Sequence, residues 1–365
     1  MNERDYSLDC IKGIACIFMI LIHAITLVTV GKSNVDGIFG VLAFFGGTAP
    51  VLFFAVSGIT SSAFQVKKSI KAIIPAYLIF GVLGVSYIGI WRANIYSSSL
   101  CDILQMMAMA VIIIVLIEKI IKPSKIFYLV ASIAVFLIHY FITSKIPAFP
   151  VKDFLFAPAV FPIFPWISMV LLGIFLYRID KKWNLLIGTS VFVVSILVSM
   201  VTKVDFFNKF NMSVGYFAVS IFVMSTVFFI SRTIKFKKLN NPILYFGKNS
   251  LLFLYVHLLA IKVFAPFTNN VLLRWIAVLI LAYLLMLGIQ FINRYIEKAF
   301  SNIVIWILMI VAVVFIPLFI GNVNLIFSLE MLIGILFSAN YHKLSGIIEK
   351  TFSHKLNLVG LKMKS

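Results

Sequence analysis

Residues Leu8 to His23 read LDCIKGIACIFMILIH, a stretch that begins with charged residues and continues as an apolar run long enough to enter a membrane. Lys12 and His23 are eleven residues apart, which at about 100° per residue places both side chains on one helix face. At about 1.5 Å per residue, His23 lies roughly 16 Å deeper than Lys12, near the middle of a hydrocarbon core about 30 Å thick. Asp9 lies within about 40° of the same line. An ionisable group at this depth is costly, so Asp9, Lys12 and His23 are candidate functional residues; the alternative for His23 is a neutral imidazole bonded to a neighbouring helix.

The composition of the whole chain extends this interpretation. The chain has 365 residues, of which 62% are hydrophobic and 12% are charged. These values are typical of a polytopic membrane protein and exclude a soluble protein with a large core. The net charge of +19 does not indicate nucleic-acid binding, because the Lys and Arg residues form short clusters between apolar runs. We therefore predict an all-α, polytopic helical bundle that lies in the lipid bilayer and binds no nucleic acid.

Apolar windows of about 20 residues predict about twelve transmembrane helices, with 10 to 12 as the range. The windows lie near residues 11–30, 38–64, 71–91, 102–121, 125–144, 155–177, 184–202, 213–231, 243–266, 273–294, 302–320 and 324–341. With a cytoplasmic N-terminus, the inner segments hold 22 of the 31 Lys and Arg residues and the outer segments hold 7. This bias predicts that both termini are cytoplasmic. It also divides the chain into a membrane-embedded domain, 1–341, and a basic cytoplasmic tail, 342–365.

The second predicted span ends in small and hydroxylated residues. Residues Pro50 to Gly58 read PVLFFAVSG, so Ser57 and Gly58 interrupt an aromatic segment. Two interpretations remain open at this stage. Either two helices pack closely at these small residues, or the backbone opens there toward a ligand.

A basic cluster precedes the third span. Lys68 and Lys71 are three residues apart and are predicted to share a helix face at the cytoplasmic surface, and Lys67 adds to the positive field. These lysines either set topology and bind anionic lipid, or they hold the phosphates of a cytoplasmic ligand such as coenzyme A.

A third polar segment, Tyr245 to His257, reads YFGKNSLLFLYVH. Ser250 is placed to cap a helix that begins here. Ser250 and His257 are seven residues apart, so they point to one face, with His257 the deeper residue. The alternative for His257 is a core histidine bonded within the bundle. The sequence has no metal-ligand spacing, P-loop or glycine-rich dinucleotide fingerprint, so we predict no metal site.

Taken in order, these motifs resemble the acyltransferase 3 family of integral membrane acyltransferases. The resemblance covers residues 4 to about 260. Its elements are Leu8, Asp9, Lys12 and His23; Phe53, Phe54, Ser57 and Gly58; Lys68, Lys71, Pro75 and Tyr77; and Gly247, Ser250, Tyr255 and His257. The heparan-glucosaminide acetyltransferases share a similar first span and late motif, within the same wider transmembrane group.

The resemblance implies an enzyme that carries an acyl group, most often acetyl, from cytoplasmic acyl-coenzyme A to a hydroxyl of an extracytoplasmic carbohydrate or glycolipid in the cell envelope. It implies that His23 is the catalytic histidine, Lys12 its basic partner, and Lys68 and Lys71 ligands of the donor phosphates. Acetyl-CoA is then a substrate, and no cofactor is bound permanently. The chain departs from the family pattern in having lysine where arginine is commoner, which removes the bidentate fork from both motifs.

From this resemblance we expect a multi-pass protein of a cell membrane, namely a cytoplasmic membrane of the bacterial type. Asp9 would orient Lys12, while Ser250, Tyr255 and His257 would shape the chamber with Ser57 and Gly58. Three alternatives remain: an exporter of a lipid-linked saccharide, an N-acetyltransferase of the heparan-glucosaminide type, and a membrane module that binds a ligand without turnover. A transporter needs no coenzyme A site, so binding of acyl-coenzyme A separates it from an enzyme.

Overall fold

A computed structural model of the chain describes residues 5–28, 37–91, 101–147, 152–156, 160–202, 204–234, 241–268 and 270–362. Helices and turns make up these residues, and no strand occurs among them. The helices in chain order are α1 (Tyr6–Val28), α2 (Gly37–Gly47), α3 (Ala49–Ala63), η1 (Gln65–Lys67), α4 (Ile70–Leu83), α5 (Val85–Trp91), α6 (Ile103–Ile120), α7 (Lys125–Ile142), η3 (Thr143–Lys145), α8 (Lys152–Leu155), α9 (Ile163–Arg178), α10 (Lys181–Ser199), α11 (Val214–Thr233), α12 (Pro242–Lys248), α13 (Ser250–Phe264), η4 (Ala265–Phe267), α14 (Val271–Ile296), η5 (Ala299–Ser301), α15 (Ile303–Phe319) and α16 (Val323–Lys362).

The predicted polytopic bundle is confirmed. Within the described ranges, 9 segments are long and apolar enough to cross a membrane, and the bent pair α12 and α13 raises the number to 10. Two further apolar helices, α9 and α15, are 16 and 17 residues long. All twelve predicted windows coincide with helices, but the exact number of spans stays a prediction because α9 and α15 are short. Helix α16 continues without a break across residues 341 and 342, where the sequence predicts a domain boundary.

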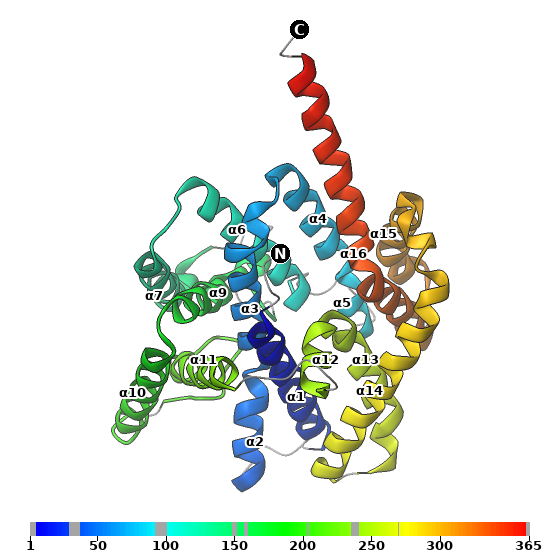
Figure 1. The fold of residues 1–365 in the computed structure, drawn as a ribbon. Helices are drawn as coiled ribbons and strands as arrows, with labels where there is room; N and C mark the ends of the chain where they lie inside the picture. The colour runs from blue at the N-terminus through cyan, green and yellow to red at the C-terminus, as the bar shows by residue number, and fades with distance from the viewer. Residues whose placement is uncertain are drawn as a thin grey trace.

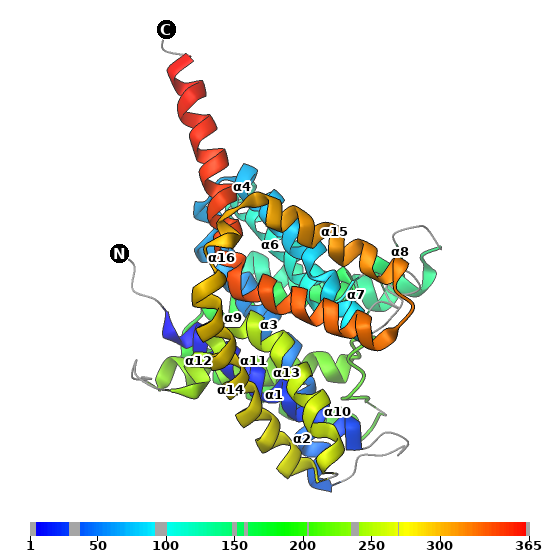
Figure 2. The ribbon, with the colours of Figure 1, turned by 90° about the vertical axis from the view of Figure 1, so that its right-hand side faces the viewer.

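Helices α1 and α3 occupy the centre of the bundle. Figure 1 shows α7, α9, α10 and α11 on one side of them and α13, α14, α15 and α16 on the other. The last part of α16 extends beyond the other helices, as the turned view in Figure 2 also shows. The central position fits the side chains of α3, of which eleven are buried. Most residues of α3 are therefore surrounded by other parts of the protein.

Close packing at Gly58 places α3 against α9. A Cβ atom at Gly58 would lie 2.6 Å from Val170 Cγ1 and 2.8 Å from the Val170 carbonyl oxygen, so only glycine allows this approach. Helix packing of this kind depends on small residues because they let two backbones come together. Of the two sequence interpretations for Ser57 and Gly58, close packing is therefore correct for Gly58.

A second close approach places α12 against α1. A Cβ atom at Gly247 would collide with the Asp9 carbonyl oxygen, and a Cβ atom at Gly13 would collide with the Ile243 carbonyl oxygen. Beyond this contact the chain turns by 105° between α12 and α13. The sequence predicts one span over 243–266, so the break is a difference from that prediction. The physical cause of the break is the contact with α1, because this contact fixes α12 in an orientation that differs from that of α13.

Hydrogen bonds of one side chain stabilise the bend. Asn249 lies at the break, where its Nδ2 donates to the Tyr245 carbonyl at 2.9 Å. Gln290 Nε2 on α14 donates to Asn249 Oδ1 at 2.8 Å. Tyr245 Oη in turn donates to Gln290 Oε1 at 3.0 Å. This network ties α12, the bend and α14 together, so the start of α13 is held at a defined place beside α1.

Candidate functional site: two chambers that meet near His23

The polar end of α1 carries an ion pair. Lys12 Nζ lies 3.0 Å from Asp9 Oδ1, and the two residues are one helical turn apart. The Asp9 side chain is 8% exposed and that of Lys12 is 23% exposed. A carboxylate this deeply buried needs a countercharge, so Lys12 both stabilises Asp9 and has its own ammonium group held in place.

Two histidine rings meet at the deeper end of α1. The ring centroids of His23 and His257 are 5.4 Å apart, with an angle of 31° between the ring planes. Trp91, the last residue of α5, lies on His23 as well, with centroids 5.2 Å apart. The structure thus brings together the two histidines that the sequence singles out on separate spans, together with an aromatic side chain that the sequence does not indicate.

His257 is held in one orientation by its own helix. Its Nδ1 lies 3.0 Å from the carbonyl oxygen of Phe253. A carbonyl only accepts hydrogen bonds, so Nδ1 carries the proton, and in the neutral ring Nε2 carries a lone pair. Nε2 is buried and has no hydrogen-bond partner within the described part of the chain. His257 is therefore both a core-bonded histidine and a neighbour of His23.

A cavity of about 210 Å³ lies beside Lys12, and we call it the Lys12 chamber. Its wall contains Lys12, Ser57, Tyr77, Ser250, Phe53 and Ile103, with further apolar side chains. Ser57 and Gly58 are adjacent in sequence but differ in role, because Ser57 faces this chamber while Gly58 packs on α9. Lys12, Ser57 and Ser250 converge as the sequence predicts, on one cavity.

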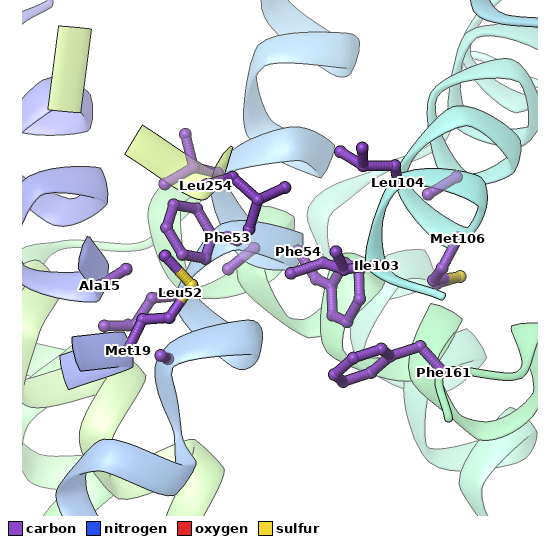
Figure 3. Close-up of a cluster of buried hydrophobic side chains, with 14 of the residues drawn as sticks. Ala15, Met19, Leu52, Phe53, Phe54, Ile103, Leu104, Met106, Phe161 and Leu254 are labelled. Carbon is purple, nitrogen blue, oxygen red and sulfur yellow. The ribbon is translucent and has the colours of Figure 1, made fainter. Parts of the chain in front are cut away.

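A second cavity of about 320 Å³ lies beside His23, and we call it the His23 chamber. Its wall contains His23, Tyr87, Trp91, Asp102, Lys209 and Phe161. It also contains Phe53 and Ile103, which belong to the wall of the Lys12 chamber too. Figure 3 shows these two side chains in the buried cluster with Leu254 and Met19. Phe53 and Ile103 are therefore the shared wall between the two chambers.

Asp102, Lys209 and Trp91 are site residues that the sequence analysis misses. They come from the start of α6, a loop after α10 and the end of α5, so no local spacing relates them. Burial lowers the pKa of Lys209, and the nearby carboxylate of Asp102 opposes that change. The only sequence signal is that all three lie at predicted ends of spans or loops between them. The wall of the His23 chamber thus carries both an acidic and a basic side chain, whereas Lys12 supplies the charge in the wall of the Lys12 chamber.

Tyr255 lies behind the wall of the His23 chamber. It is fully buried, and its hydroxyl is 2.9 Å from Ser86 Oγ. Its ring meets that of Tyr87 edge-on, with centroids 5.8 Å apart. Tyr87 belongs to the chamber wall and Tyr255 does not. Tyr255 therefore supports the chamber by holding Tyr87 rather than by facing a ligand.

The lysine cluster lies apart from both chamber walls. The prediction that Lys68 and Lys71 share a helix face is wrong, because α4 begins at Ile70 and Lys68 follows η1 in an extended conformation. Lys68 forms an ion pair with Glu349 of α16, and Lys67 lies over the Phe64 ring. Neither chamber wall includes Lys67, Lys68 or Lys71.

Comparison with known proteins gives one family match. Residues 4–185 match the family model described as heparan-alpha-glucosaminide N-acetyltransferase, catalytic. A search of curated proteins finds no match. The match covers α1, α3, α4 and α6 of the Lys12 chamber and ends before α13 and α16, which complete its wall.

The match indicates a transmembrane acetyltransferase, an enzyme that transfers acyl groups, and its similarity is to the heparan-glucosaminide-like group. It supports that wider group and does not show the acyltransferase 3 family, so membership of the latter stays a prediction. Acetyl-CoA as donor is consistent with this match, as is a multi-pass membrane location given the apolar helices.

Proposed function

We propose that the chain is a membrane O-acetyltransferase that moves the acyl group of cytoplasmic acetyl-CoA to a hydroxyl of an extracytoplasmic carbohydrate of the cell envelope. The supporting observation is that the Lys12 chamber and the His23 chamber share Phe53 and Ile103 as a wall. A reaction whose two substrates come from opposite faces of a membrane needs such a pair of chambers. The Lys and Arg bias assigns the Lys12 chamber to the cytoplasmic side.

In the proposed reaction His23 acts on the acceptor. Its imidazole accepts the proton of the acceptor hydroxyl while the oxygen attacks the thioester carbon. The carbon–sulfur bond breaks, and the proton passes to the thiolate of coenzyme A. In the other route a ring nitrogen of His23 attacks the thioester carbon, the carbon–sulfur bond breaks and coenzyme A leaves as its thiolate. The acceptor oxygen then attacks the acyl carbon, the imidazole is released, and the hydroxyl proton passes to the thiolate. His257 supports either route, because its ring lies beside that of His23 and its Nε2 carries a lone pair.

The remaining predicted residues hold the substrates. Lys12, oriented by Asp9, faces the chamber through which the donor's acyl arm approaches. Ser57 and Ser250 offer hydroxyls along the same wall. In this proposal Lys67 and Lys71 attract the phosphates of the donor to the cytoplasmic surface, while Lys68 pairs with Glu349 of α16. Gly58 fixes the position of α3, and Tyr255 and His257 shape the His23 chamber.

The His23 chamber suits a sugar acceptor. Trp91 and Tyr87 offer aromatic faces and edges, and Asp102 and Lys209 offer a hydrogen-bond acceptor and a donor. An apolar and aromatic wall with a few placed polar groups is typical of small-molecule sites. A sugar combines apolar ring faces with hydroxyls, so its chemistry matches this wall.

The first test removes the imidazole. We expect His23→Ala to lower acetyl transfer by about 10³-fold and His257→Gln by about 10-fold, as the loss of a general acid–base group and of its neighbour should do. The assay measures transfer from labelled acetyl-CoA in membranes that contain the envelope acceptor. His139→Gln is the matched control, since His139 is a buried histidine of α7 that bonds Asn211 and lines neither chamber. Retained transfer in His23→Ala would reject the assignment.

N-acetylation is the second candidate, and the family match favours it because the matched family is named for N-acetyl transfer to glucosaminide. The two products differ chemically, since an ester is cleaved by mild alkali and an amide is not. We expect the acetyl group added by this protein to be released by mild alkali. Release only under strong acid would establish the N-acetyltransferase instead.

A further inference from the structure

A third cavity adjoins the Lys12 chamber at the proposed cytoplasmic end. It has a volume of about 470 Å³ and includes Lys248, Arg294 and His342 in its wall. Ser250, Leu251 and Tyr341 belong both to this wall and to that of the Lys12 chamber. We call this third cavity the vestibule. Figure 1 shows its helices α12, α13, α14 and α16 together on one side of the bundle.

The vestibule carries unneutralised positive charge. The carboxylate in its wall, Glu297, lies 3.7 Å from Lys343 in an ion pair. Within the described ranges of the chain, neither Lys248 nor Arg294 forms an ion pair. The opposite holds for Lys68, whose charge is neutralised by Glu349. Unlike Lys67, Lys68 and Lys71, the two cations of the vestibule line a cavity that shares wall residues with the Lys12 chamber.

Hydrogen bonds between helices fix the wall of the vestibule. Gln290 and Asn249, which hold the bend between α12 and α13, both belong to its wall. Asn293, also in the wall, exchanges hydrogen bonds with Asn340 at 2.7 and 3.1 Å, which ties α14 to α16. The first turn of α13 completes the wall, and its backbone N–H groups lack partners inside the helix and favour anions. These features place cations around a pre-formed entrance.

We infer that the vestibule binds the diphosphate and ribose phosphate of the acyl-coenzyme A donor, through Lys248 and Arg294, so that the pantetheine arm passes Tyr341 and Ser250 into the Lys12 chamber. This inference rests on the proposed function, which supplies the donor. Arg294 offers a planar fork that pairs with phosphate oxygens, and Lys248 offers a point charge. In this arrangement Lys68 is a structural partner of Glu349 and not a phosphate ligand.

The test measures binding of coenzyme A and of pantetheine, which lacks the phosphates and the nucleotide, to the purified full chain in detergent by calorimetry. Arg294→Gln and Lys248→Gln should each raise the Kd for coenzyme A by about 10-fold, as expected for one charge-assisted bond. The Kd for pantetheine should stay unchanged. Arg294→Lys should retain part of the affinity. Lys298→Gln, which removes a charge one turn beyond Arg294 and outside the vestibule, and Lys68→Gln should bind as the unaltered chain does.

The outcomes separate the two proposals. If the unaltered chain binds coenzyme A and both vestibule variants bind it equally well, the inference is overturned while the proposed function stands. The inference is likewise overturned if Lys68→Gln weakens binding of coenzyme A instead. It is also overturned if the vestibule variants raise the Kd for pantetheine as much as the Kd for coenzyme A. If the unaltered chain binds no coenzyme A, the proposed function itself fails. Lys248 and Arg294 are exposed, and a thermal melt of each variant confirms that it is folded.

Discussion

The two chambers that meet at Phe53 and Ile103 differ in what builds them. In the wall of the Lys12 chamber, the polar residues Lys12, Ser57 and Ser250 lie at positions that the sequence motifs mark. The His23 chamber owes its charge to Asp102 and Lys209, which no motif marks. The difference teaches that a site along one helix follows from periodicity, whereas a site assembled from loops and helix ends depends on the whole fold.

The largest expected effect concerns the contact that positions the Lys12 chamber. Gly247→Leu should prevent stable folding, because its Cβ would collide with the Asp9 carbonyl oxygen and force α12 away from α1. Overpacking of this kind costs about 1–3 kcal/mol and more where backbone atoms are in the way. Gly288→Leu is the matched control, since a Cβ at Gly288 meets nothing within 4 Å. Thermal unfolding in detergent measures both, and equal melting temperatures would contradict this packing.

The next effect concerns the charge at the end of the same chamber. Lys12→Gln removes the countercharge of the buried Asp9 carboxylate, and breaking a buried pair from one side costs about 3–5 kcal/mol. The partial exposure of Lys12 lowers this to roughly 1–3 kcal/mol. Asp9→Asn should cost less, because the remaining ammonium is the more exposed partner. Chemical denaturation gives both values, and the double variant should be more stable than Lys12→Gln alone. If the double variant is no more stable than Lys12→Gln, the loss of the Asp9–Lys12 ion pair is not what destabilises Lys12→Gln.

A smaller effect tests the wall between the chambers. Phe53→Ala should join the two chambers and let water reach the thioester, so hydrolysis of acetyl-CoA without acceptor should rise by a few fold, about 1 kcal/mol in barrier. The adjacent Phe54→Ala removes an equally large side chain that lines neither chamber and packs behind the wall against Phe161 and Trp166. It should lower stability without raising hydrolysis. Equal hydrolysis in the two variants would contradict the assignment of Phe53 to the wall.

The smallest effect belongs to the His23 chamber. Burial lowers the pKa of Lys209 in the folded state, so the unfolded chain binds more protons between that pKa and the ordinary value of 10.5. Stability of the unaltered chain should therefore rise with pH across that window. Lys209→Met removes this rise, so the variant should be the more stable protein at neutral pH and lose its advantage toward pH 10.5. Melting temperatures measured against pH check the sign, and parallel curves would show that Lys209 is not buried.

The helices and the α1 site are predictable from the sequence because they depend on local patterns. Apolar windows place the helices, and the eleven-residue spacing puts Lys12 and His23 on one face of α1. The spacing does not indicate that the two residues line different chambers, because the wall between the chambers comes from α3 and α6. The bend between α12 and α13 is not predictable, because it depends on how Gly13 and Gly247 let α12 approach α1. The prediction for Lys68 fails for a related reason, since a cluster of lysines does not say where α4 begins.

The central claim is that acetyl transfer takes place at His23, in a chamber that adjoins the Lys12 chamber across Phe53 and Ile103, and cysteine labelling tests it most directly. Cys10, Cys16 and Cys101 are first replaced by serine, and His23→Cys is then introduced. We predict that an impermeant thiol reagent labels this cysteine from the outer face, and that acetyl-CoA added at the cytoplasmic face slows the labelling. Labelling from the outer face that acetyl-CoA leaves unchanged, or no labelling at all, would contradict the claim.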